Sequence, residues 1–159
     1  MIKKYLVIGN PIEHSLSPKL HNYWLKENNI SANYDKKTLY ENELEKIISE
    51  VKEEKINGIN VTVPFKKAVI PFLDELSPEA ENTQSVNTIY LNNRKVIGHN
   101  TDIAGFELSV KKIKYDVTDK KVLILGAGGV VSSIIFALYK MKAFKIAISN
   151  RTKEKEIGK

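Results

Sequence analysis

The sequence predicts an α/β fold built on a mostly parallel sheet. Short apolar segments of strand length alternate with longer segments whose apolar residues recur every three or four positions. Towards the C-terminus a strongly apolar stretch runs directly into a glycine-rich turn, and a helical pattern follows. We therefore expect an α/β domain over residues 1–113 and the opening βαβ unit of a second domain over residues 114–159.

The N-terminal segments predict a strand followed by a helix. Residues 2–9 are mostly apolar, which favours a strand. Ser17 and Pro18 then indicate a helix start, with Ser17 as the N-cap and Pro18 at the first helical position. The helix extends to about residue 28. Its apolar stripe consists of Leu20, Trp24 and Leu25.

The next segments predict a strand, a helix and a further strand. Residues 33–40 have strand character, and residues 41–54 form an amphipathic helix. The apolar face of this helix consists of Leu44, Ile47, Ile48 and Val51. Residues 59–63 alternate apolar and polar side chains, as a half-buried strand does. Pro64 ends this strand because proline has no N–H to donate to the ladder.

Two short helices and a hairpin complete the sheet of the first domain. We expect the helices at residues 66–73 and 77–83. The hairpin joins residues 86–91 to residues 95–97 and turns at Asn92–Asn93, because asparagine tolerates positive φ.

A longer helix leads from the hairpin to the second domain. Asp102 opens this helix, which covers residues 103–112, and the helix dipole favours a carboxylate at that end. Residues 115–120 form a short polar connector. The βαβ unit then consists of a strand at 121–125, a helix at 130–141 and a strand at 144–148.

The composition excludes several classes of protein. Hydrophobic residues make up 42% and charged residues 28%, as in globular proteins, and no apolar run approaches the length of a membrane span. With no cysteine and three scattered histidines, we expect neither disulfides nor a bound metal. The net charge of +6 comes from lysines interleaved with glutamates, so we expect anionic small molecules rather than nucleic acid as partners. The N-terminus lacks a signal-peptide pattern, which favours a cytoplasmic protein.

The segment from Asn60 to Lys66 is the first candidate site. It places an amide, a hydroxyl and an amine at the end of a predicted strand, on Asn60, Thr62 and Lys66. Open α/β sheets bind their ligands at the carboxyl ends of their strands. Lys66 could there hold or protonate a ligand oxygen, or it could be a solvated lysine that opens a surface helix.

The glycine-rich turn is the second candidate site. Gly126, Ala127, Gly128 and Gly129 lie between a strand and a helix, as in Rossmann-type sites where backbone N–H groups approach a pyrophosphate. The full pattern needs a glycine or alanine at position 131, which is Val131 here. A tight strand–helix turn is the alternative, but the apolar strand before it and the helix after it favour a dinucleotide site.

The end of the second strand of this unit indicates which dinucleotide binds. NAD sites usually place an acidic residue about 20 positions after the glycines. Here Asn150, Arg151 and Thr152 offer no acid, and a guanidinium can bind a phosphate through two hydrogen bonds. We therefore expect NADP, which carries a phosphate on that ribose, although a basic surface loop would have the same residues.

Six short motifs, in this order and at this spacing, resemble those of shikimate dehydrogenase. They are GNPIEHSLSP at 9–18, NVTVPFK at 60–66, SVNT at 85–88, GHNTD at 98–102, GAGG at 126–129 and NRT at 150–152. The resemblance extends from about residue 5 to residue 152. It implies reversible, NADP-dependent conversion of shikimate to 3-dehydroshikimate in aromatic amino-acid biosynthesis.

The resemblance also implies a role for each site residue. Lys66 and Asp102 match the catalytic pair, in which the lysine exchanges a proton with the reacting oxygen and the aspartate orients it. The substrate-binding residues would be Ser15, Ser17, Thr62 and Asn87. From the residues alone, Ser17 is better explained as a helix cap than as one of two serines facing the same ligand, and Thr62 and Asn87 as polar residues that satisfy nearby backbone groups. The cofactor-binding residues would be Gly126, Ala127, Gly128, Gly129, Val130, Asn150, Arg151 and Thr152.

The chain departs from the pattern of this family in three respects. Ser85 stands where the family usually has glycine, and Val130 and Val131 stand where it has smaller residues. The chain also ends after one βαβ unit, whereas a dinucleotide-binding domain usually has about six strands. A catalytically inactive shikimate-binding fragment and a quinate/shikimate dehydrogenase are therefore the alternatives. A homodimer is compatible with the resemblance.

Overall fold

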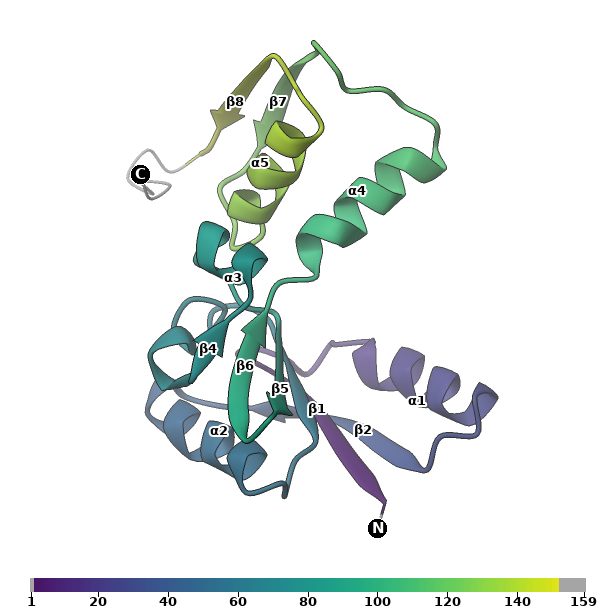
Figure 1. The fold of residues 1–159 in the computed structure, drawn as a ribbon, viewed down its shortest axis with the longest axis vertical. Coiled ribbons are helices and arrows are strands. Elements are labelled where there is room, and N and C mark those ends of the chain that lie inside the picture. Colours follow the sequence, from purple (N-terminus) through teal and green to yellow (C-terminus); the bar gives the residue numbers. More distant parts are fainter. Residues whose placement is uncertain (1, 152–159) are drawn as a thin grey trace.

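The computed structural model describes residues 2–151, whose strands form two separate sheets (Figure 1). The larger sheet has six strands in the order β2-β1-β3-β5-β6-β4, and the smaller sheet pairs β7 with β8. The strands are β1 (Lys3–Gly9), β2 (Ala32–Thr38), β3 (Gly58–Val61), β4 (Glu75–Leu76), β5 (Thr88–Asn92), β6 (Lys95–His99), β7 (Lys121–Leu125) and β8 (Lys145–Ser149). The helices are α1 (Ser17–Glu27), α2 (Leu44–Lys52), α3 (Pro78–Thr83), α4 (Asp102–Lys112) and α5 (Val131–Lys140), with short 3-10 helices η1 (Glu41–Glu43) and η2 (Ile70–Phe72).

The strand pairing confirms the predicted α/β class. Strand β1 pairs in parallel with β2 and β3, and β4 pairs in parallel with β6. Strand β5 forms a hairpin with β6 and is antiparallel to both β6 and β3. The six-stranded sheet is therefore mixed but mostly parallel.

Helices α1 and α2 cover opposite faces of the large sheet. Ile8 of β1 belongs to a buried cluster that includes all four apolar residues predicted for α2. The neighbouring Val7 belongs to a second cluster, with Tyr34 of β2 and Leu25 of α1. Because successive side chains of a strand point to opposite faces, these clusters lie on the two sides of the sheet.

The start and the apolar stripe of α1 differ from the prediction. Ser17 is the first helical residue, and the N-cap position is Leu16. The hydroxyl that satisfies a backbone group here belongs to Ser15, whose Oγ accepts the N–H of Ser17 at 3.3 Å. Leu20 and Trp24 are 47% and 48% exposed, because α1 packs mainly on the edge strand β2 rather than over the centre of the sheet.

Strand β3 is shorter than predicted. It ends at Val61 rather than at residue 63, because the adjacent strand β5 begins at Thr88, which pairs with Asn60. The backbone of Thr62 and Val63 still bonds to the end of β1, with Thr62 N–H donating to the Ile8 carbonyl at 3.0 Å.

The short helix predicted over residues 66–73 is present only in part, because turns are followed by the 3-10 helix η2. The carbonyl of Lys66 accepts the N–H of Val86 at 2.8 Å instead of an N–H four residues later. Pro71 also lacks the N–H that an α-helix would donate to the carbonyl of Lys67.

Two features of the hairpin region also differ from the prediction. The turn lies at Asn93 and Arg94, one residue later than expected, and both have positive φ (49° and 63°). Glu75 and Leu76 form the short edge strand β4, which was not predicted.

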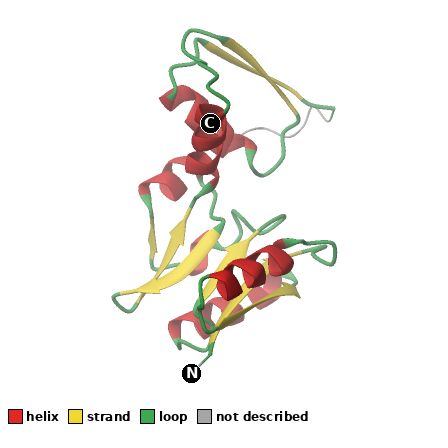
Figure 2. Cartoon of the chain, turned by 90° about the vertical axis from the view of Figure 1, so that its right-hand side faces the viewer, coloured by secondary structure: helices red, strands yellow, loops and turns green. Residues whose placement is uncertain are grey.

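The predicted βαβ unit is confirmed, with β7 and β8 parallel and α5 between them in the chain. Figure 2 shows this unit extending beyond the large sheet. Helix α5 packs against α3 and α4, so it connects the two parts of the molecule. Val122 and Ile124 are half-buried, whereas Leu123 and Leu125 are 60% and 80% exposed. One face of the small sheet is therefore covered and the other presents apolar side chains to solvent.

Candidate active site

Lys66 and Asp102 form the centre of the candidate active site. Lys66 follows β3 after a turn in which Phe65 N–H donates to the Thr62 carbonyl at 2.9 Å. Asp102 is the first residue of α4, just after β6. Lys66 Nζ lies 2.7 Å from Asp102 Oδ2, and the side chains are 15% and 22% exposed. The ion pair is therefore shielded from bulk water but still accessible to a ligand.

Asn87 holds the other oxygen of Asp102. Its Nδ2 donates to Asp102 Oδ1 at 2.9 Å and to Thr101 Oγ1 at 2.8 Å. Its Oδ1 accepts the Thr101 N–H at 3.0 Å and the Thr88 hydroxyl at 3.0 Å. The structure thus brings together Lys66, Asn87 and Asp102, three of the residues predicted for the site, in one hydrogen-bonded cluster.

Asn100 supports this cluster from the interior. It is 1% exposed, and its Oδ1 accepts the Asp102 N–H at 2.9 Å, which fixes the start of α4. Its Nδ2 lies within hydrogen-bond distance of three oxygens, the Ser85 carbonyl at 2.9 Å, Thr83 Oγ1 at 3.0 Å and Ser133 Oγ at 2.8 Å, which share its two N–H groups. Because Ser133 is on α5, Asn100 joins the aspartate of the site to the βαβ unit.

The serine at position 85 does not occupy a backbone conformation that needs glycine. The left-handed residue of this turn is Gln84, with φ 48°, at the C-terminal end of α3. Ser85 itself is buried, and its Oγ has no hydrogen-bond partner among residues 2–151. The turn that leads to Asn87 therefore tolerates a side chain at position 85.

Thr62, Ser15 and Ser17 lie where β3 and β1 end at the same edge of the sheet. Thr62 comes directly after β3, and the serines lie in the loop and first helical turn that follow β1. A Cβ added to Gly9 at the end of β1 would lie only 2.6 Å from Thr62 Cγ2, so glycine permits this close approach. The Ser15 hydroxyl bonds locally, to the Ser17 N–H.

The glycine-rich turn has an open backbone and lies beside the first candidate site. Gly126 has φ +107°, and its N–H donates to the Ser149 carbonyl at 2.7 Å. A Cβ added to Gly128 would meet no atom within 4 Å, so a ligand can approach this backbone. A Cβ added to Gly129 would lie 4.0 Å from a methyl group of Val63, in the segment that carries Lys66.

The two valines after the glycines lie at the start of α5. Val131 begins α5 and is buried, whereas Val130 is 40% exposed. Ala127 is half-buried in the turn itself.

The residues predicted to bind the cofactor phosphate follow β8. Asn150 is half-buried and Arg151 is exposed, and Thr152 lies outside the described residues. The bond between Gly126 and Ser149 brings the end of β8 next to the glycine-rich turn.

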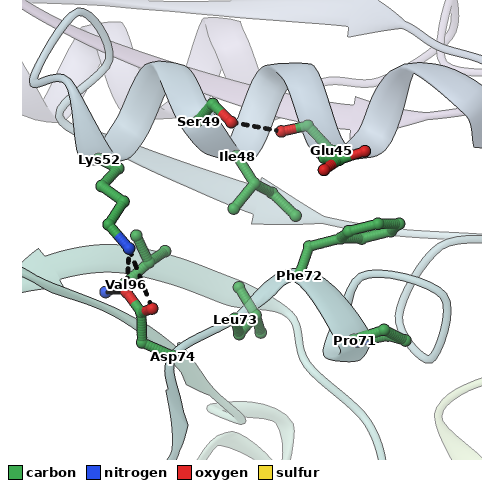
Figure 3. Close-up of a pocket in the computed structure, with 9 residues that line it drawn as sticks. All are labelled: Glu45, Ile48, Ser49, Lys52, Pro71, Phe72, Leu73, Asp74 and Val96. Atoms are coloured by element: carbon green, nitrogen blue, oxygen red, sulfur yellow. Dashed lines mark hydrogen bonds and ion pairs between the residues drawn. The ribbon is translucent and has the colours of Figure 1, made fainter.

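A separate pocket of about 280 Å³ lies between α2 and the segment leading into β4 (Figure 3). Its lining residues are Glu45, Ile48, Ser49, Lys52, Pro71, Phe72, Leu73, Asp74 and Val96. Lys52 Nζ lies 3.1 Å from Asp74 Oδ1. The N–H of Val96 and the ammonium of Lys52 together lower the pKa of Asp74. None of the predicted site residues lines this pocket.

Residues 2–151 contain no group of three or more histidine or acidic side chains placed to hold a metal ion. No helix in the same range is long and apolar enough to cross a membrane.

Comparison with known proteins gives the family. Residues 7–89 match the family model described as "Shikimate dehydrogenase substrate binding domain". The chain belongs to the shikimate dehydrogenase family. Residues 107–157 match a second model, "Shikimate / quinate 5-dehydrogenase", which covers the βαβ unit.

Individual shikimate dehydrogenases are similar over nearly the whole chain. The NADP(+) shikimate dehydrogenase of Pelagibacter ubique is 62% identical over 157 residues, which are 99% of this chain and 59% of that protein. The crystal structure of the Aquifex aeolicus enzyme is 42% identical with a TM-score of 0.88, over 96% of this chain and 57% of that one. The Thermus thermophilus enzyme, in complex with NADP(H) and shikimate, is 32% identical with a TM-score of 0.85, over 94% and 56%.

The chain spans a little more than half the length of these shikimate dehydrogenases.

Several residues hydrogen-bonded within or next to the site cluster were assigned no role from the sequence. They are Tyr34, Thr88, Asn100 and Thr101. All except Tyr34 lie within the family motifs quoted above, which was the available signal.

Proposed function

We propose that this chain provides the substrate-binding part of an NADP-dependent shikimate dehydrogenase, which interconverts shikimate and 3-dehydroshikimate. The observation that carries the proposal is the 2.7 Å ion pair between Lys66 and Asp102 at the carboxyl edge of the sheet. In a member of this family, an ammonium group held there by a carboxylate is suited to proton transfer with a ligand oxygen.

Lys66 and Asp102 have different roles at the reacting carbon. Reduction of a ketone develops negative charge on its oxygen, which a neighbouring ammonium group stabilises and protonates. Lys66 therefore donates a proton to that oxygen in the reducing direction and takes it back in the oxidising direction. Asp102 orients the Lys66 ammonium through Oδ2 and accepts a hydrogen bond from an adjacent substrate hydroxyl.

The remaining polar side chains hold the substrate in register. We assign the carboxylate of shikimate to the hydroxyls of Ser15 and Ser17, and its ring hydroxyls to Thr62 and Asn87. What supports this assignment is that the serines follow β1 and Thr62 follows β3, whereas Asn87 directly precedes the antiparallel strand β5, so all four lie at the same edge of the large sheet. Asn87 is also already bonded to Asp102.

NADP would supply or accept the hydride. We assign its pyrophosphate to the glycine-rich turn, where the open position of Gly128 and the nearness of Gly129 to the Val63 side chain are compatible with a cofactor beside the substrate. The full set of cofactor residues is Gly126, Ala127, Gly128, Gly129, Val130, Asn150, Arg151 and Thr152. Arg151, which is exposed beyond β8, would bind the 2′-phosphate.

The same proposal includes the domain boundaries, the cellular location and the assembly of the chain. Residues 1–113 form the substrate domain and residues 114–159 open the NADP-binding domain, which agrees with the separate sheets on either side of that boundary. We place the protein in the cytoplasm, with a homodimer as the assembly to be tested by its mass in solution.

Two measurements on the chain test this function. The first follows NADPH formation from shikimate and NADP, and the second follows shikimate binding by calorimetry. Each compares the unaltered chain with Lys66→Ala and with Lys67→Ala, which removes an equal charge from the exposed neighbouring position. We expect Lys66→Ala to lower turnover by about 10² to 10⁴ and Lys67→Ala to leave it unchanged.

The outcomes separate the candidate functions. Turnover that disappears in Lys66→Ala alone supports the dehydrogenase. Shikimate binding without turnover identifies a substrate-binding fragment. The uncovered apolar face of the small sheet favours this outcome. Turnover with quinate, or with NAD, would point to a quinate/shikimate dehydrogenase. A chain that neither binds shikimate nor turns it over contradicts the proposal.

A further inference from the structure

Tyr34 is a buried residue of β2 whose hydroxyl reaches the strand that leads to the site. It is 5% exposed, and its hydroxyl donates to Asn60 Oδ1 at 2.6 Å, across 26 positions of the chain. Asn60 lies on β3, and β1 lies between β2 and β3 in the sheet. The bond therefore passes across β1 rather than joining two neighbouring strands.

The position of Tyr34 is fixed from two sides by α1. Asn22 forms two bonds with its backbone: Nδ2 donates to the Tyr34 carbonyl at 2.7 Å, and Oδ1 accepts the Tyr34 N–H at 2.9 Å. The ring of His21 stacks on the ring of Tyr34, with centroids 4.1 Å apart and planes 5° from parallel. The hydroxyl is thus held in place before any ligand binds.

Asn60 passes this constraint to Asn87. Its Nδ2 donates to the Asn87 carbonyl at 3.3 Å and to Thr88 Oγ1 at 3.2 Å. The Thr88 hydroxyl then donates to Asn87 Oδ1 at 3.0 Å, and Asn87 Nδ2 donates to Asp102 Oδ1 at 2.9 Å. An unbroken series of hydrogen bonds therefore runs from Tyr34 to the aspartate of the ion pair.

We propose that Tyr34 is a positioning residue, which sets the orientation of the Asn87 amide by fixing the Asn60 side chain. This inference rests on the proposed function, in which Asn87 binds a ring hydroxyl of shikimate. Tyr34 itself touches neither substrate nor cofactor in this scheme.

The direction of the bonds explains why the hydroxyl matters. An asparagine amide can turn by half a rotation and exchange its donor and acceptor ends. The Asn87 carbonyl can only accept, so it requires Asn60 Nδ2 on its side, and the Tyr34 hydroxyl stabilises this orientation by donating to Oδ1. Burial raises the pKa of Tyr34, which keeps the phenol protonated and able to donate.

Removal of the hydroxyl alone tests the proposal. Tyr34→Phe keeps the ring and its stacking on His21 but removes the donor to Asn60. We expect the shikimate dissociation constant to rise about tenfold, equivalent to about 1.4 kcal/mol, with a melting temperature close to that of the unaltered chain. The matched control is Tyr90→Phe on β5, whose ring is 38% exposed, and we expect it to change neither quantity.

A second variant interrupts the same series beyond Asn60. Thr88→Val has nearly the same shape but cannot donate to Asn87 Oδ1, so it should weaken shikimate binding by a similar factor. Tyr34→Phe and Thr88→Val together should cost little more than either alone, because both break one series of bonds. Losses that simply multiply would contradict the proposal, since they would mean that the two residues act independently.

A measurement without ligand separates this inference from the proposed function. The side-chain amide resonances of Asn60 and Asn87 should both shift in Tyr34→Phe and should stay in place in Tyr90→Phe. If the Asn87 amide does not move, the inference is overturned, whether or not the chain binds shikimate. If the unaltered chain binds shikimate and Tyr34→Phe binds it equally well, the inference is also overturned while the proposed function stands. If the amide moves but no variant binds shikimate, the coupling is supported and the proposed function fails.

Discussion

Lys66 and Asp102 form an ion pair of 2.7 Å although 36 positions separate them in the chain. Their contact depends on the order of the large sheet, in which β5 lies between β3 and β6. Lys66 follows β3 and Asp102 follows β6, and the bond from Val86 N–H to the Lys66 carbonyl fixes the lysine backbone. The pair is thus a product of the topology rather than of local sequence.

The coupling between these two side chains can be measured by a double-mutant cycle. Lys66→Met and Asp102→Asn should each lower the free energy of unfolding by about 1–2 kcal/mol, because each leaves the other, partly buried side chain without its oppositely charged partner. The double variant should lose about 1 kcal/mol less than the sum. Urea unfolding of the four proteins gives these values, and strictly additive losses would show that the ion pair contributes nothing to stability.

Arg151 should discriminate between NADP and NAD. A guanidinium that binds the 2′-phosphate loses charge-assisted hydrogen bonds in Arg151→Gln, so NADP affinity should fall about tenfold or more. NAD lacks that phosphate and should bind almost as before. The control is Arg94→Gln, which removes an equal charge from the exposed hairpin turn. Equal losses for the two dinucleotides would exclude a phosphate-binding role for Arg151.

The parts of the fold that could be predicted are those with a regular apolar period. The four apolar residues assigned to one face of α2 are all buried against the sheet. The turns before η2 could not be predicted, because a longer helix is prevented by the bond from Val86 N–H to the carbonyl of Lys66, twenty residues away. Strand β4 has two residues, which is too short to show any period.

The candidate site divides in the same way. The family motifs indicated Lys66, Asn87 and Asp102, and the structure joins these three by direct hydrogen bonds. The contribution of Tyr34 had no local signal, because its bond to Asn60 depends on the register of three strands. The roles proposed for Ser15, Ser17 and Thr62 stay predictions until a ligand is measured.

Asn100 should be the polar residue whose loss costs most stability. Asn100→Ala removes the acceptor for the Asp102 N–H and the donor to three oxygens in a fully buried place. We expect a loss of about 2–4 kcal/mol in the free energy of unfolding. Asn100→Asp should cost at least as much at neutral pH, because it buries a carboxylate against the Ser85 carbonyl, which can only accept.

The matched control for Asn100 is Asn82→Ala. Asn82 is exposed on α3, and its Nδ2 bonds only locally to the Pro78 carbonyl at 2.7 Å. Asn82→Ala should lower the free energy of unfolding by less than about 0.5 kcal/mol. If thermal or urea unfolding shows the same loss for Asn100→Ala as for Asn82→Ala, Asn100 does not connect the site to α5 energetically.

His21 should make the stability of the chain depend on pH. Burial lowers the pKa of His21 in the folded state, so the unfolded chain takes up a proton at higher pH than the folded one. The contribution of neutral His21 to stability is therefore fully present above its unfolded pKa of about 6.5 and is lost as the pH falls through the lowered folded value. His21→Phe keeps a ring to stack on Tyr34 but cannot titrate, so its free energy of unfolding should fall less between about pH 7 and pH 5.

His14→Gln, at an exposed position, should follow the unaltered chain. A His21→Phe profile parallel to that of the unaltered chain would mean that the stacked imidazole is protonated as easily in the folded state as in the unfolded one.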